Sequence, residues 1–106
     1  MTNFSDMLSK AKIMQEKMRE AQDQIKKIEV EGLSGGNLVK VILKGDYELK
    51  TIEINEQAKK EYQEIINALI IAAYNNAKQN LKKKSAEELS KVTGGLNLPT
   101  DFKLPF

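Results

Sequence analysis

The chain has 106 residues, a formal net charge of +2, and neither Cys nor His. A chain of this length buries about two-thirds of its unfolded surface in one domain, so we expect a single domain over residues 1–106. The missing thiols and imidazoles exclude disulfides, thiolate chemistry, the commonest general base and the commonest metal ligands. No remaining Ser, Lys or Asp has a partner that would activate it. We therefore expect no enzyme, no cofactor and no small-molecule substrate.

The small net charge hides an uneven distribution. Residues 1–28 carry six basic and four acidic side chains, residues 29–64 carry five and eight, and residues 65–106 carry six and three. Basic ends around an acidic middle mildly favour a polyanion held between helices, although solvated faces of a Lys-rich protein give the same counts.

The sequence also bears on location. Residues 1–6 lack the basic and apolar regions of a signal peptide. The longest apolar run, residues 68–74, is far too short to span a membrane. We therefore expect a cytoplasmic bacterial protein with no membrane partner.

Apolar residues at the start of the chain recur at alternating steps of three and four. The a positions are Phe4, Ala11, Met18 and Ile25, and the d positions are Met7, Met14, Ala21 and Ile28. An unbroken heptad over four repeats predicts a long helix whose seam packs along the second long helix or along a sister chain. A lone amphipathic helix packed on its own sheet is the alternative.

The pattern then changes to a period of two. Alternation around Val30, over Val39–Leu43 and over Leu49–Ile54 predicts three strands, the third bulged near Lys50-Thr51. Short Gly-containing turns at 33–37 and 45–46 make the sheet an antiparallel meander. One face is polar, so helices need to cover only the other face.

A broad apolar stripe predicts a second long helix from about Lys59 to Lys83. Its members are Tyr62, Ile65, Ile66, Leu69, Ile70, Ala73, Ala77 and Leu81. Lys84 would fall on this stripe, so we expect the helix to end or bend there. Ser85 and Glu88 have the spacing of a capping box, which predicts a short third helix through Val92 that Gly94-Gly95 ends.

The last nine residues form an apolar segment in which Pro99 and Pro105 exclude a regular helix. Such a segment must lie against the rest of its own domain or against another subunit. We assign its large side chains to a dimer interface, with packing inside one chain as the alternative. These are Leu98, Phe102, Leu104 and Phe106.

Basic side chains on the two long helices are the candidate binding residues. They are Lys10, Lys12, Lys17, Arg19, Lys26, Lys78, Lys82, Lys83 and Lys84. Two such ridges on a helical arm could bridge phosphates, which lie about every 1.7 Å along a DNA duplex. Glu16 and Asp23 follow Lys12 and Arg19 by four residues and could pair with them instead.

Four stretches, in order, resemble the YbaB/EbfC family of bacterial nucleoid-associated proteins. They are Met14-Gln15-x-x-Met18, Ser34-Gly35-Gly36-x-x-Val39-x-Val41, Ala72-Ala73-Tyr74-Asn75-Asn76-Ala77 and Leu96-x-Leu98-Pro99-x-x-Phe102-Lys103-Leu104-Pro105-Phe106. Asn76 stands where the family has Asp, and Thr100-Asp101 where it has Pro-Gly. The match covers essentially the whole chain.

The resemblance implies an α+β homodimer with projecting helical arms that grip double-stranded DNA with low sequence specificity. Compaction or bending of DNA in the nucleoid, and indirect effects on transcription, would follow. The rival hypothesis is a protein-binding coiled-coil adaptor or chaperone-like module, because Met7, Met14 and Met18 can present an adaptable apolar surface.

Overall fold

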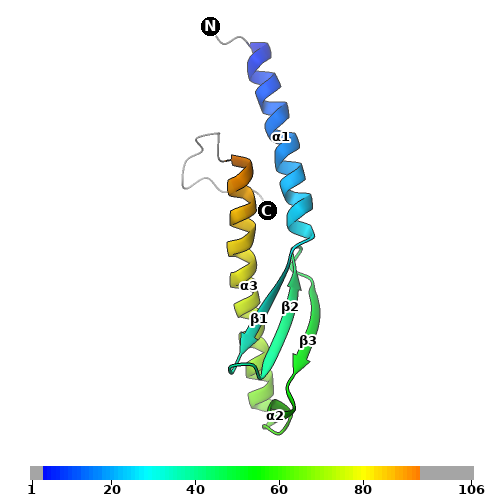
Figure 1. The fold of residues 1–106 in the computed structure, drawn as a ribbon, viewed down its shortest axis with the longest axis vertical. Helices are drawn as coiled ribbons and strands as arrows, with labels where there is room; N and C mark the ends of the chain where they lie inside the picture. The colour runs from blue at the N-terminus through cyan, green and yellow to red at the C-terminus, as the bar shows by residue number, and fades with distance from the viewer. Residues whose placement is uncertain (1–3, 94–106) are drawn as a thin grey trace.

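A computed structural model describes residues 4–93. Within this range the elements are α1 (Phe4–Lys26), β1 (Glu29–Ser34), β2 (Val39–Lys44), β3 (Leu49–Ile54), α2 (Glu56–Lys59) and α3 (Gln63–Thr93). The strands form an antiparallel sheet in the order β1-β2-β3, α3 lies along one face of it, and α1 runs beside α3 and away from the sheet (Figure 1). This confirms the α+β fold with two long helices and a three-stranded meander.

The inner face of β2 is the centre of the core. Val39, Val41 and Leu43 are completely buried, and the side chains that alternate with them are half-buried on the outer face. From α3, the completely buried Ala73 and Ala77 pack against this face. Small residues on α3 let the helix lie close to the sheet.

The predicted bulge is present in β3. Ile42 pairs with Thr51 and Leu43 pairs with Leu49, so Lys50 is the extra residue. In the turn between β1 and β2, Gly35 and Gly36 adopt φ of 58° and 73°, a region that favours glycine.

The start of the second long helix differs from the prediction. α3 begins at Gln63 and not near Lys59, because α2 is a separate turn, capped by the Asn55 side chain, that buries Ala58 in the core. Two predicted members of the apolar stripe are exposed: Tyr62 precedes α3 and is 81% exposed, and Ile65 is 43% exposed.

The end of this helix also differs. α3 continues without a break through Lys84 to Thr93, so the predicted bend, the capping box at Ser85 and the separate short helix are wrong. Ser85 and Leu89 line a hollow together with Ile25 of α1. Because α3 is unbroken, its last turns place Ser85 and Leu89 next to α1. The predicted C-cap at residues 94–95 and the apolar segment at residues 98–106 lie outside the described residues.

Only part of the α1 heptad is covered by α3. Ala21 and Ile25 are buried and Met18 is half-buried, which confirms the predicted pairing of the two long helices near the sheet. Toward the start of α1 the seam is open, with Phe4 73% and Met7 60% exposed. Across residues 4–93, no helix combines the length and apolar character needed to cross a membrane.

Candidate nucleic-acid interface

The predicted basic residues lie on two neighbouring helices, and all nine are exposed. α1 carries Lys10, Lys12, Lys17, Arg19 and Lys26, and α3 carries Lys78, Lys82, Lys83 and Lys84. The two helices lie side by side beyond the sheet (Figure 1). The fold thus places the α1 set on a projecting pair of helices, which we call the helical arm (α1 and the part of α3 beside it), whereas the α3 set lies where α3 still packs along β1.

On α1 the structure brings Lys12 and Arg19 together. With Gln15 and Glu16 they line one shallow hollow of about 340 Å³. The ion pairs found within residues 4–93 use lysines 40, 44, 50, 59 and 91 instead. Within residues 4–93, Glu16 and Asp23 therefore do not form ion pairs with Lys12 and Arg19. The cationic groups of these two side chains face solvent.

On α3 the structure separates residues that the sequence placed in one cluster. Lys83 and Lys84 line a hollow beside Glu29, Glu31 and Glu87, whose charges oppose an incoming phosphate. Lys78 and Lys82 are one helical turn apart and are not among the residues that line that hollow. Among the candidate lysines of α3, these two are therefore not grouped with the carboxylates of this hollow.

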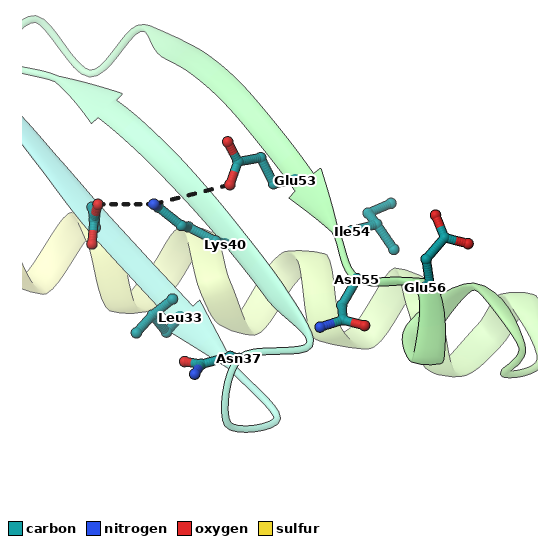
Figure 2. Close-up of a pocket in the computed structure, with 8 residues that line it drawn as sticks. Leu33, Asn37, Lys40, Glu53, Ile54, Asn55 and Glu56 are labelled. Carbon is teal, nitrogen blue, oxygen red and sulfur yellow. Dashed lines mark ion pairs between the residues drawn. The ribbon is translucent and has the colours of Figure 1, made fainter.

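The charged side chains on the outer face of the sheet form ion pairs, and Figure 2 shows one group of them. Lys40 Nζ lies 3.0 Å from Glu31 and 3.9 Å from Glu53. The hydrogen bond from Lys40 to Glu31, with the charges of both carboxylates, raises the pKa of Lys40, so this amine remains protonated. These residues line an open hollow of about 640 Å³ that also includes Glu56. This hollow has more carboxylates than amines and disfavours phosphate, whereas the candidate lysines and the arginine on α1 and α3 are outside the ion pairs of residues 4–93.

Two polar residues on α3 have a structural role that the sequence analysis missed. The side-chain oxygen of Asn76 accepts a hydrogen bond of 2.9 Å from the backbone N–H of Leu33. The side-chain nitrogen of Asn80 donates one of 2.8 Å to the backbone carbonyl of Glu31. Together they close the outer edge of β1. Their spacing of four places both on one face of the helix, and this was the available signal.

No group of acidic side chains within residues 4–93 is arranged to hold a metal ion. An exposed cationic helical arm on a small α+β core is the arrangement of a polyanion-binding protein. The chain belongs to the YbaB/EbfC DNA-binding family, whose sequence model matches residues 1–96. This confirms the family resemblance seen in the sequence, and this family is a DNA-binding family rather than a class of enzymes.

Relatives match over almost the full length. The chain is 41% identical over 107 residues to a nucleoid-associated protein of Granulibacter bethesdensis, covering 100% of both chains. It is 36% identical over 104 residues to one of Hahella chejuensis, covering 98% of this chain and 96% of the relative. A Rickettsia typhi nucleoid-associated protein is 41% identical over 107 residues, again covering 100% of both.

One solved structure has the same fold. The crystal structure of an uncharacterized protein from Helicobacter pylori matches with a TM-score of 0.71 at 19% sequence identity, covering 90% of this chain and 100% of that one. At this identity the match supports the α+β architecture alone.

Proposed function

We propose that this protein is a nucleoid-associated protein that binds double-stranded DNA with low sequence specificity through its helical arm. One observation carries the proposal: exposed Lys and Arg side chains gather on α1 and α3, outside the ion pairs of the described residues, while the lysines of the sheet are paired with carboxylates. Membership of a DNA-binding family and the names of the relatives support it. The expected location is the nucleoid, in the cytoplasm.

The proposed mechanism is electrostatic. Lys and Arg side chains replace condensed counterions at phosphates, which gives affinity that falls steeply with salt. Phosphate contacts position a protein without reading base sequence, so affinity is similar on unrelated duplexes. Compaction or bending of DNA and indirect effects on transcription follow from many such contacts along one duplex. No catalytic step is part of the proposal.

A mobility-shift titration tests this function. The unmodified protein is titrated onto several unrelated duplexes at a series of salt concentrations. We expect similar affinities on all duplexes and a log–log salt slope that grows by about 0.9 for each phosphate contacted. Absence of binding at low salt would refute the function. Strong preference for one duplex would refute the low specificity.

We further propose that the active form is a homodimer. Residues 68–74 of α3 are apolar on every side of the helix, and Ile71 is 61% exposed although Ile70 beside it is half-buried. A helix that is apolar on all sides is normally covered on all sides, so a second copy is expected to supply the missing cover.

The residues first assigned to the dimer interface, Leu98, Phe102, Leu104 and Phe106, lie outside the described range and remain a proposal. We expect removal of residues 96–106 to weaken the dimer, because burial of a single large apolar side chain contributes roughly 1.5–3 kcal/mol. Sedimentation equilibrium of the full and shortened chains measures this. An unchanged dimer dissociation constant would show that these side chains are not part of the dimer interface.

The rival function, a protein-binding adaptor, is favoured by one observation. The free end of α1 exposes large apolar side chains, namely Phe4, Met7, Leu8 and Ile13. Salt separates the two functions, because phosphate binding weakens with ionic strength whereas apolar binding does not.

A further inference from the structure

The apolar seam of α1 is covered near the sheet and open toward the start of the helix. Ala21 and Ile25 are buried where α3 packs along α1, whereas Phe4 is 73% and Met7 60% exposed. Figure 1 shows the reason, because α1 extends beyond the end of α3 and no other element of residues 4–93 lies beside its first turns. We call this part of the seam the tip seam, and its members are Phe4, Met7, Ala11 and Met14.

The tip seam continues the spacing of the covered seam without a break. Phe4 and Ala11 are a positions of the heptad, as is the buried Ile25. Met7 is a d position, as is the buried Ala21. A repeat of 3.5 residues keeps one side of a helix against a partner helix along its whole length. α3 is that partner near the sheet, so the tip seam extends an existing helix–helix interface and fits a further helix.

The basic side chains of α1 lie outside the tip seam. Lys12 and Arg19 are at b positions, on the outward side of the helix. Lys10 and Lys17 are at g positions, beside the seam. A helix that docks on the tip seam therefore leaves Lys12 and Arg19 exposed, so one α1 can contact phosphate and a second helix at the same time.

The tip seam is complementary to its own reverse. In an antiparallel pair centred on Ser9, Phe4 of one copy faces Met14 of the other, and in the next layer Met7 faces Ala11. Each layer then sets a large side chain against a small or flexible one. A parallel pair would set Phe4 against Phe4 and Ala11 against Ala11, which crowds one layer and leaves a gap in another. Because α1 projects away from the sheet, antiparallel tips also keep the two sheets far apart (Figure 1).

We propose that the tip seams of two copies pair as a short antiparallel coiled coil and thereby link two DNA-bound homodimers. The inference rests on the proposed function and adds a contact between homodimers. The exposed apolar residues that support the homodimer, around Ile71, are near the start of α3. That end of α3 is at the opposite end of the molecule from the start of α1, so one copy can use both surfaces (Figure 1). Linked arms bring two duplexes together, which is a physical route to compaction.

Bound DNA is expected to favour this pairing. Two heptads make a weak contact in dilute solution, but several homodimers on the same duplex raise the effective concentration of their tips. In an antiparallel pair g positions face each other, so the Lys10 side chains of the two copies repel each other. A phosphate bound near both amines removes that repulsion. We therefore expect tips to pair on DNA at protein concentrations at which free homodimers do not associate.

The first test places a charge on the tip seam. Met7→Glu is compared with Ile13→Glu, because Ile13 is similarly exposed, at 53%, on the same helix but outside the seam, at a c position. The measurement is the capture of a labelled duplex by an immobilised duplex of unrelated sequence when the protein is added. We expect Met7→Glu to lower capture by about tenfold or more and Ile13→Glu to leave it nearly unchanged. Mobility shift and circular dichroism verify that both variants bind one duplex equally and are folded.

The second test introduces no charge. The native chain has no Cys, so a mixture of Met7→Cys and Ala11→Cys proteins reports the contact between copies. Disulfides form only where the Cα atoms approach to about 4.4–6.8 Å. On DNA, we expect the mixture to crosslink about tenfold faster than either variant alone, because positions 7 and 11 face each other only in the antiparallel pair. Ile13→Cys is expected not to crosslink.

The outcomes separate this inference from the proposals on which it rests. Capture that survives Met7→Glu, or a mixture that crosslinks no faster than the single variants, overturns the tip contact and leaves DNA binding and the homodimer standing. Coverage of the tip seam by residues 96–106 would give the same absence of crosslinks. An unmodified protein that does not shift a duplex overturns the proposed function and this inference together. One that sediments as a monomer overturns the homodimer, and with it a link between homodimers.

Discussion

Reversal of charge at Lys12 and Arg19 is expected to weaken binding to every DNA duplex by about tenfold or more at low salt, and to lower the salt slope by roughly two. The two side chains are exposed and line the same hollow on α1, so one phosphate strand could contact both. The double variant Lys12→Glu/Arg19→Glu loses two phosphate contacts and no base contact, so unrelated duplexes should be affected alike. Lys78→Glu/Lys82→Glu tests the corresponding pair on α3.

A charge-matched control separates the effect of the changed positions on DNA binding from the effect of a lower net charge. Lys59 and Lys60 are exposed at the opposite end of the molecule, by α2 (Figure 1). Lys59→Glu/Lys60→Glu should leave DNA binding nearly unchanged. Exposed substitutions typically alter stability by no more than about 0.5 kcal/mol each. Lys59→Glu also breaks the ion pair with Glu56, so melting curves verify that each variant is folded. Equal loss in the control would assign the effect to net charge, and full binding by the α1 variant would exclude α1 from the interface.

Gly32→Ala is expected to destabilise the fold by about 3 kcal/mol or more. A Cβ at this position would lie 2.1 Å from the Ala73 carbonyl oxygen and 2.5 Å from the Ala77 nitrogen. Both are backbone atoms of α3, so no side-chain rotation can relieve the overlap. β1 and α3 would have to separate, which would also disturb the hydrogen bonds that join β1 to Asn76 and Asn80. Urea denaturation followed by circular dichroism measures the change.

Gly36→Ala is the matched comparison. No heavy atom lies within 4 Å of a Cβ at this position, so the added methyl meets only the cost of the positive φ of 73°, roughly 1–2 kcal/mol. The difference between the two variants therefore reports the close packing of β1 on α3. Equal destabilisation by the two changes would contradict that packing.

The sequence by itself determined the elements whose signals are local. Period-two alternation with Gly35-Gly36 predicted the strands and first turn, and the irregular spacing around Lys50 predicted the bulge. The heptad predicted α1, because apolar spacing and helical periodicity depend on neighbouring residues alone. The four motif stretches likewise sufficed for the family, and the positions of the basic residues followed from the helices that carry them.

Tertiary contacts decided what local signals leave open. The spacing of Ser85 and Glu88 fits a capping box, and it fits the interior of a helix equally well. The placement of Ser85 and Leu89 beside α1 favours the uninterrupted helix. The sequence alone did not show that Asn76 and Asn80 close the β1 edge, and an Asp at position 76, as in the family motif, would offer an equivalent acceptor oxygen.

Exposure was decided in the same way. Leu49 and Ile52 alternate like core residues, yet they are exposed because α3 covers only β1 and β2. Lys83 and Lys84 lie beside acidic residues that are about fifty positions away in the chain. Burial and electrostatic environment depend on what the fold places next to a side chain, and that information is absent from local periodicity.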